Sequence, residues 1–332
     1  MKKNEECEKK IRLLKGDNFC NRYRIEGILT TRSPFHLGNG DTVRRRGLNK
    51  DGKEGIQTRG TAGSGSKEQA AKKQEPVDVS AITVDYRGQP VIPGSSLKGA
   101  LRNYLLDICL ASRQEGLAAD LNYDELIRTK EKLKKQKGQI EFARDEISVL
   151  ERLFGTPFAE GKTEVWDGEC ISPPPELPPA IRNPEKPPFW DSERMTFVDQ
   201  SVAIDPETGT AVDKKLYHYE VVPPGISFRI NISGQNLVRA ETGMLLFGLY
   251  AFNSEIWPLT LGAMSGRGFG HFDFHLENVY HLPKSDVGKW IRKALENDHA
   301  GYMSLKCLPQ KEQDDYIKEF KKMFLKCTGD ES

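Results

Sequence analysis

The sequence predicts an α+β fold with a ferredoxin-like βαββαβ core that carries long insertions. Three observations support this class. Residues 22–32 alternate partly between apolar and polar side chains, as a strand does, and residues 97–109 follow with a helical apolar period. Further along, a mostly apolar helix over 237–252 leads through a glycine-rich loop into an alternating strand at 272–276. A doubly wound parallel sheet fits poorly, because several predicted strands connect through hairpins rather than helices.

The overall composition is that of a water-soluble chain, with 37% hydrophobic and 29% charged residues among 332. We interpret residues 1–332 as one domain with insertions. No apolar run approaches the roughly 20 residues that a membrane span needs, and the N-terminal segment lacks the apolar centre of a signal peptide. We therefore expect a cytoplasmic protein with no membrane partner.

Six cysteines are spread widely through the chain, and no two of them form a CxxC pair. This spacing excludes a zinc finger that could be recognised from the sequence. In a cytoplasmic chain of this size, free buried thiols are the favoured interpretation. A metal site built from distant Cys and His side chains stays open as an alternative.

The first predicted strand ends in a loop, "SPFHLGNGD", at residues 33–41. His36 stands between an apolar pair there, and Gly38 and Gly40 follow it. The two glycines permit positive φ and the close approach of another backbone.

Residues 41–75 predict a flexible basic insertion, because they contain few apolar residues and many Gly, Ser, Lys and Arg. The charge of the whole chain is only +1, yet residues 1–75 hold 18 Lys and Arg against 10 Asp and Glu. This local excess suggests a polyanionic partner. A solvated tail would have the same composition, so both interpretations stay open.

The next segment, "PVIPGSSLKGALR", predicts a helix that begins at Ser95 or Ser96, whose hydroxyl would cap the first free backbone N–H groups. Lys98 and Arg102 are four residues apart and lie off the apolar face. The helix dipole disfavours a cation in the first turn by a few tenths of a kcal/mol, roughly. Lys98 is therefore predicted to face an anion.

The middle of the chain predicts a charged helical segment and one further insertion. Residues 122–153 are charged and helical, and Gly155 is well placed to end the last helix. A stiff proline-rich excursion over 170–192 follows, since its prolines can neither pair centrally in a sheet nor continue a helix.

A hairpin over residues 199–220 is predicted next, because Asp205–Gly209 has strong turn chemistry between two β-prone stretches. The later loop Gly266–Gly270 resembles a phosphate-binding loop only superficially, since a strand rather than a helix follows it. Its backbone can still approach a ligand closely, and Arg267 can pair with a phosphate. A C-terminal extension over 283–332 contains two predicted helices, at 286–297 and 310–326.

Five motifs occur in a specific order: "HLGNG", "PVIPGSSLKGALR", "LFGTPF", "AIDPETGTAVDKKLYHYEVVPPGISF" and "GAMSGRGFG". Together they resemble the RAMP superfamily of CRISPR-associated proteins. The nearest likeness is to the repeated backbone subunit of type III effector complexes, over roughly residues 22–275. The segments 41–75 and 170–192 and the C-terminal helices fall outside the common pattern.

The resemblance implies an RRM-like palm that binds the sugar-phosphate backbone of a guide crRNA, with copies of the subunit stacked along it. The 199–220 hairpin would be a thumb that wedges into the guide–target duplex and flips out nucleotides at regular intervals. Implied partners are the guide, a complementary target RNA, adjacent backbone subunits and a large polymerase-like subunit. The residues expected at the RNA are His36, Gly38, Gly40, Arg44, Arg45, Ser95, Ser96, Lys98, Arg102, Gly266, Arg267, Gly268 and Phe269.

The same resemblance implies cleavage of the target RNA by a metal-dependent activity that uses one aspartate. Counting back from Pro93 without gaps aligns the family's catalytic aspartate with Asp78. This chain departs from the family just after it, with Val79–Ser80 where the family often has Asn-Pro. Asp41 and Asp85 are the alternatives, and the expected cofactor is a divalent ion, Mg²⁺ or Mn²⁺.

Two other functions stay open. The chain could be a structural subunit of the same complex that binds RNA without cutting it. It could also be a guide-processing endonuclease that uses histidine for acid–base chemistry, in which case His36 is the candidate and no divalent metal is needed.

Overall fold

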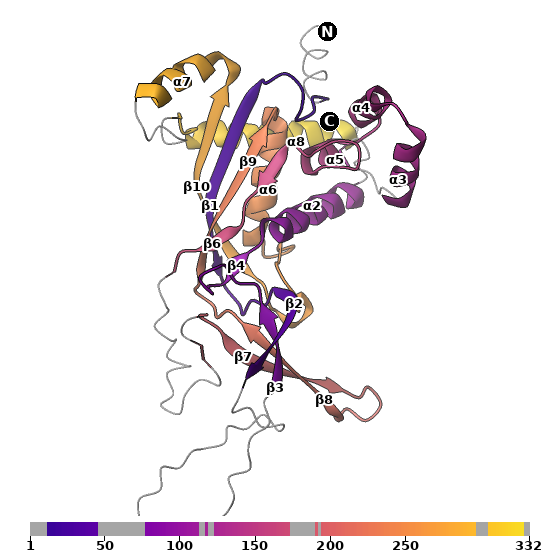
Figure 1. Cartoon of the computed structure of the whole chain (residues 1–332), viewed down its shortest axis with the longest axis vertical. Helices are drawn as coiled ribbons and strands as arrows, with labels where there is room; N and C mark the ends of the chain where they lie inside the picture. Colours follow the sequence, from indigo (N-terminus) through magenta and orange to yellow (C-terminus); the bar gives the residue numbers. More distant parts are fainter. Residues whose placement is uncertain are drawn as a thin grey trace, which may run out of the picture.

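The computed structural model of the protein describes residues 12–45, 77–112, 117–118, 123–172, 190–191, 194–296 and 305–328. These residues form two β-sheets and the helices α2 to α8 (Figure 1), so the predicted α+β class is confirmed. The larger sheet lies with helices on one side of it, and the smaller sheet lies at one end of the larger one.

The larger sheet is centred on β1, which pairs antiparallel with β9 on one side and β10 on the other. Its strands in spatial order are β10 (Phe272–Pro283), β1 (Asn21–Thr31), β9 (Ser227–Gln235), β6 (Gly168–Cys170) and β4 (Val91–Ile92), and β5 (Thr163–Val165) also pairs with β9. The predicted strands at 22–32 and 272–276 are both confirmed. A bulge falls at Glu26/Gly27, where a Cβ on Gly27 would lie 2.5 Å from the ring of Phe274.

The helices α2 (Gly94–Ala111) and α6 (Arg239–Tyr250) bury their apolar faces against this sheet. Their leucines meet the inward side chains of β1, β9 and β10 in one continuous core. Helix α8 (Gln310–Thr328) packs closely on α6, since a Cβ on Gly243 would lie 2.1 Å from the carbonyl oxygen of Tyr316.

The start of α2 corrects one prediction, because neither Ser95 nor Ser96 caps the helix. The helix begins at Gly94, and the Asp167 carboxylate accepts a hydrogen bond from the Gly94 N–H at 2.7 Å. A Cβ on Gly94 would lie 2.2 Å from the carbonyl oxygen of Val165. The helix start is therefore docked tightly on the β5–β6 turn, and a carboxylate distant in sequence does the capping.

The smaller sheet has the order β2 (Gly38–Arg45), β3 (Val77–Ile82), β8 (Ala211–Val221) and β7 (Phe197–Ile204). Strand β2 corrects the prediction that residues 33–41 are a loop and that a flexible insertion begins at 41, because pairing with β3 extends to Arg45. The rest of that insertion, 46–75, lies outside the described residues. Strands β7 and β8 form an antiparallel hairpin, and β3 runs parallel to β8.

The remaining helices follow the sequence pattern. They are α3 (Tyr123–Lys132), α4 (Gln136–Asp145), α5 (Val149–Phe154) and α7 (Val287–Glu296), with short 3-10 turns η1 (Ala251–Asn253), η2 (Ser265–Arg267) and η3 (Lys284–Asp286). Gly155 ends α5 with φ of 107°, as predicted. Most of the proline-rich excursion predicted over 170–192 lies outside the described part of the chain, and its first residue, Cys170, is the last residue of β6. Within that part, no helix is long and apolar enough to cross a membrane.

An ion pair is buried inside this core. Lys162, just before β5, donates to both carboxylate oxygens of Glu241 at 2.7 and 3.0 Å, and both side chains are 0% exposed. Glu241 also accepts the N–H of Val238 at 2.9 Å at the start of α6. This pair ties the loop before β5 to the first turn of α6.

Candidate nucleic-acid interface

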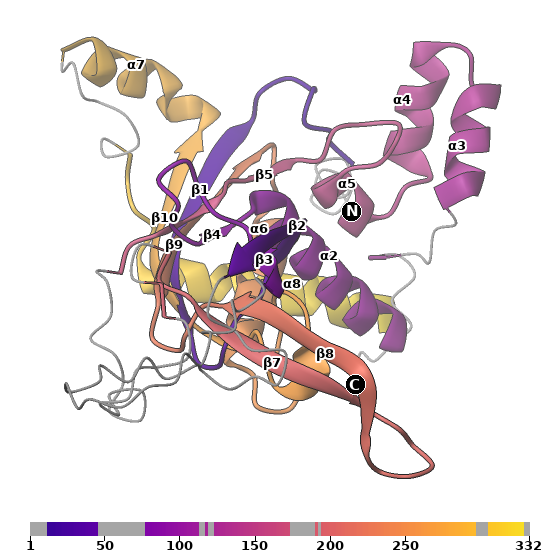
Figure 2. The same cartoon turned by 60° about the horizontal axis from the view of Figure 1, so that its bottom comes forward.

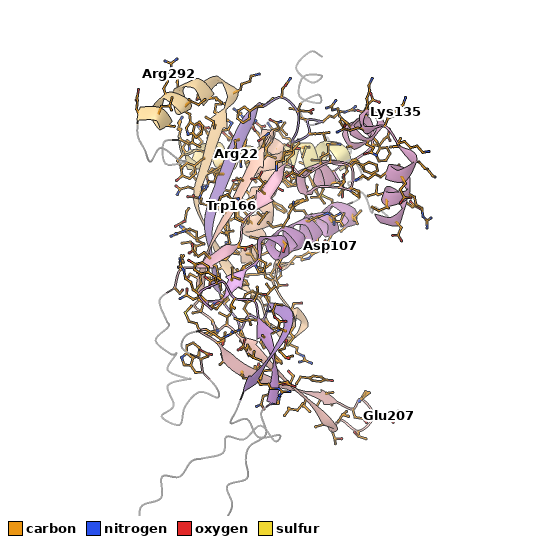
Figure 3. All side chains as sticks on the ribbon, in the orientation of Figure 1. Arg22, Asp107, Lys135, Trp166, Glu207 and Arg292 are labelled. Atoms are coloured by element: carbon orange, nitrogen blue, oxygen red, sulfur yellow. The ribbon has the colours of Figure 1, made fainter. Side chains whose placement is uncertain are left out.

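The hairpin of β7 and β8 extends from the smaller sheet away from the rest of the protein (Figure 2). Its turn carries Glu207, labelled in Figure 3. The Asp205 carboxylate accepts the N–H groups of Glu207 at 2.8 Å and of Thr208 at 3.2 Å, and Gly209 has φ of 67°. The predicted turn chemistry is thus present at Asp205–Gly209. Its action as a thumb stays a prediction.

The glycine-rich loop lies against the base of this hairpin. Phe269 is buried and meets the ring of Tyr219 edge-on, with centroids 6.1 Å apart. Arg267 donates to the Ser201 hydroxyl of β7 at 2.6 Å. Gly268 has φ of 82°, and Gly266 stands in open space, where the backbone is accessible. The loop therefore joins the hairpin rather than standing alone as a phosphate cradle.

His36 lies between the two sheets and is buried. Its Nδ1 is 2.6 Å from the carbonyl oxygen of Glu220, and its ring meets Tyr219 at 5.7 Å between centroids. A Cβ on Gly38 would lie 3.1 Å from its Nε2, whereas Gly40 faces open space with φ of 87°. His36 therefore has a packing role in this structure, and any contact of its ring with RNA stays a prediction.

A second buried carboxylate, which the sequence analysis missed, lies beside His36. Glu220 is 0% exposed, accepts the Ile82 N–H at 3.2 Å and pairs with Arg194 at 2.9 Å. These bonds join β8 to β3 and to the segment before β7. The only sequence signal was a charged residue inside the apolar stretch "LYHYEVV".

The three candidate aspartates have different surroundings. Asp85 accepts the N–H groups of Arg87 and Gln89 at 2.8 and 2.9 Å, which closes a turn. Asp41 accepts the side-chain amide of Asn39 at 2.7 Å and lines a pocket of about 590 Å³ on the smaller sheet.

Asp78 lies on β3 itself, not in a loop as predicted. Its side chain is 61% exposed and lies 3.2 Å from Nε of Arg44 on the neighbouring strand. Arg45 also belongs to β2, but its side chain lies outside the described residues. Asp78 is thus the candidate whose carboxylate holds no turn and faces solvent beside a cation.

Lys98 and Arg102 do not lie together with this aspartate on the smaller sheet, since both belong to α2. Lys98 is half-buried and donates to the Thr163 carbonyl oxygen at 3.4 Å. Burial lowers the pKa of Lys98, and the charge of Lys15 lowers it further. Arg102 lies 3.9 Å from the buried Glu151, and burial raises the pKa of that carboxyl group. Either cation could still meet an anion, because neither is fully enclosed.

A scan against protein families matches the RAMP superfamily over residues 28–273. The chain belongs to the RAMP superfamily. A search of curated proteins finds no match. Members of the RAMP superfamily bind crRNA within CRISPR-associated complexes, and some members are ribonucleases.

The RAMP region runs from within β1 to the start of β10 and so includes the whole smaller sheet with its hairpin, the glycine-rich loop, and the larger sheet except most of β10 and the first part of β1. Helices α7 and α8 lie beyond it. Every residue that we expected at RNA therefore lies inside the RAMP region, from His36 to Phe269.

Sequence reasoning missed a group of side chains on the face of the larger sheet opposite α2 and α6. Arg22 and Trp166 are labelled there in Figure 3. Trp166 is 53% exposed, and Arg24 lies over its ring at 5.9 Å. Arg229 is exposed on β9, opposite Ile28 of β1. The strand alternation could have revealed Arg22 and Arg24, since polar and apolar side chains alternate over residues 22–26.

The residues around Asp78 fit a divalent ion that takes few protein ligands. Mg²⁺ is usually held by one or two carboxylates, water and the phosphates of its substrate, and the exposed Asp78 carboxylate offers one such ligand. Among the described residues, no group of three or more His, Cys, Asp or Glu could hold a metal by itself. The described cysteines, Cys20, Cys109, Cys170 and Cys307, are free, as predicted, but only Cys109 is buried.

Proposed function

We propose that the protein is a crRNA-binding backbone subunit of a type III CRISPR effector complex. We further propose that it cleaves the complementary target RNA and that Asp78 is the catalytic residue. One observation carries the choice of residue. Asp78 is exposed on the same four-stranded sheet as the β7–β8 hairpin and beside Arg44, whereas Asp85 holds a turn and Asp41, on the same sheet, is bonded to Asn39 at its edge. A thumb that splays a nucleotide out of the duplex would therefore act on the same sheet as this carboxylate.

The proposed palm is ferredoxin-like. If β5 and β6 count as one interrupted strand, and β2–β4, α3–α5 and the β7–β8 hairpin count as insertions, the core elements follow in the order β1, α2, β5–β6, β9, α6, β10, which is a βαββαβ succession. In space the strands follow the order β10, β1, β9, β6, and all neighbours run antiparallel. On its open face Arg22 and Arg24 pair with Glu164 at 3.0 Å and Glu26 at 2.8 Å, whereas Arg229 and Trp166 are exposed. The exposed guanidinium and indole suit an RNA phosphate and an unstacked base.

The proposed chemistry uses the nucleophile that RNA carries. In a splayed nucleotide, the 2′-oxygen attacks the adjacent phosphorus, the new P–O2′ bond forms, and the P–O5′ bond breaks. Asp78 accepts the proton of the 2′-hydroxyl, and the departing 5′-oxygen takes a proton from water. A bound divalent ion would stabilise the negative charge on the phosphate oxygens. The products are a 2′,3′-cyclic phosphate and a 5′-hydroxyl.

The proposal is tested with the complex assembled on its guide crRNA. A 5′-labelled complementary RNA should be cut at regularly spaced positions in the presence of Mg²⁺ or Mn²⁺, and a non-complementary RNA should stay intact. No product above background, with the target still bound, would favour the structural subunit instead.

The same assay with a chelator tests the histidine-based alternative. We expect cleavage to stop when the divalent ion is removed, because a single carboxylate leaves the phosphate charge uncompensated. Cleavage of a precursor crRNA in chelator would support guide processing instead, although His36 is buried and its Nδ1 already has a partner.

Replacing Lys98 by methionine should weaken guide binding and reduce its salt dependence by about one phosphate contact, a slope change of roughly 0.7 for single-stranded RNA. Methionine keeps the length and packing of the half-buried stem and removes only the charge. Binding of crRNA measured at several salt concentrations gives the slope. Lys135→Met, on the exposed start of α4, is the matched control. An unchanged slope for Lys98→Met would mean that Lys98 contacts only protein.

A further inference from the structure

Four side chains form a row across the smaller sheet. Arg44 of β2 pairs with Asp78 of β3, and Tyr217 of β8 pairs with Ser201 of β7. The two pairs meet because β3 and β8 run parallel with Ser80 beside Tyr219. Asp78 and Tyr217 each stand two residues before this bridged pair, so their side chains lie on the same face of the sheet, on the two sides of the β3–β8 junction.

The side chains one step further along these strands, at Tyr219, are covered by other parts of the protein, whereas the row through Tyr217 is exposed to solvent. Tyr219 is 5% exposed because Phe269 and the glycine-rich loop cover it, whereas Tyr217 is 55% exposed. Ser201 ties the two rows together, since its hydroxyl lies 2.6 Å from the hydroxyl of Tyr219 and accepts from Arg267. The glycine-rich loop therefore covers Tyr219 but leaves the ring of Tyr217 exposed.

The row has a cation at each end. Arg44 is 77% exposed beside Asp78, and Arg267 approaches from the glycine-rich loop at Ser201. Adjacent paired strands are about 4.8 Å apart, so four side chains on four strands span at least roughly 14 Å. That length suits a short piece of single-stranded nucleic acid, with phosphates near the two arginines and a base near the tyrosine between them.

We propose that the row Arg44–Asp78–Tyr217–Ser201 is a binding site for an unstacked nucleotide of single-stranded RNA, whose base stacks on Tyr217. A base inside a duplex has no free face to offer, so the site selects a splayed nucleotide. This site rests on the proposed function, because it places such a nucleotide beside Asp78. Tyr217 is then a positioning residue that brings the sugar of the bound nucleotide to the carboxylate.

The test uses the full chain carrying Asp78→Asn, so that binding is measured whether or not the protein cuts RNA. The probe is a single-stranded RNA oligonucleotide with one 2-aminopurine, whose fluorescence is quenched on stacking. We expect Tyr217→Leu to weaken binding about 5- to 100-fold and to remove the quenching. Tyr217→Phe should keep both, since the ring rather than the hydroxyl does the stacking.

The controls separate a stacking site from general binding of phosphate. Tyr86→Leu removes another exposed tyrosine, on the turn before β4, and should change little. Double-stranded RNA of the same sequence should bind Tyr217→Leu as well as it binds the parent. Equal binding and quenching for Tyr217→Leu and the parent would overturn the site, and so would an equal loss with duplex RNA. If the quenching depended on Tyr217 but the wild-type complex did not cleave its target, the nucleotide-binding site would stand and only the proposed nuclease activity would be rejected.

Discussion

Replacing Asp78 by alanine should slow cleavage of the target RNA by about 100- to 10,000-fold, the usual contribution of a positioned proton acceptor. Guide binding and complex assembly should persist, because the side chain is 61% exposed and its pair with Arg44 lies in solvent. Such exposed pairs contribute little to stability. The measurement is single-turnover cleavage of a labelled target by the assembled complex, with target binding measured separately.

Two matched variants separate Asp78 from its neighbours. Asp41→Ala removes an exposed carboxylate from the adjacent strand and should leave the rate within a few-fold of the parent. Asp78→Asn keeps a side chain that can accept a hydrogen bond from Arg44, and it should be as inactive as Asp78→Ala. If the Asp78→Ala complex cut the target RNA at the same positions as the wild-type complex, Asp78 would have no part in the mechanism. If Asp41→Ala abolished cleavage, the catalytic role would belong to Asp41.

Elements with a local signal were predictable from the sequence. The apolar period of residues 97–109 predicts α2, and the alternation of residues 22–32 predicts β1. In each case the apolar side chains lie on the buried face of a single helix or strand, so the pattern is visible within one short segment. Gly155 was identified as the end of α5 for a similar reason, since a residue with positive φ is needed there.

Elements whose partners are remote were not predictable in the same way. Strand β2 is basic and rich in glycine, and it is a strand because β3 pairs with it beyond a long insertion. The start of α2 is similar. Ser95 and Ser96 are good capping residues, but Asp167 does the capping from the β5–β6 turn. The row through Asp78 and Tyr217 also depends on strand pairing, so no spacing along the chain could reveal it.

Buried ion pairs are the features that the sequence predicts least, because both partners are remote from each other in the chain. Lys162 and Glu241 are separated by 79 residues, and both resemble ordinary surface residues in the sequence. Only the fold shows that each is fully enclosed and that each is the other's partner. A charge in such a place has no water to compensate it, so the pair should control the stability of the domain.

Replacing Lys162 by methionine should lower the free energy of unfolding by about 3–5 kcal/mol, because it leaves the Glu241 carboxylate buried without its cation. Urea unfolding followed by circular dichroism measures the change. The double variant Lys162→Met/Glu241→Gln should be more stable than Lys162→Met alone, since the amide carries no charge and its oxygen can still accept the Val238 N–H. Lys318→Met, which breaks an exposed pair with Asp315, is the control and should change stability little. If Lys162→Met were as stable as this control, the pair would be dispensable, and the junction of α6 with the loop before β5 would be held by apolar packing alone.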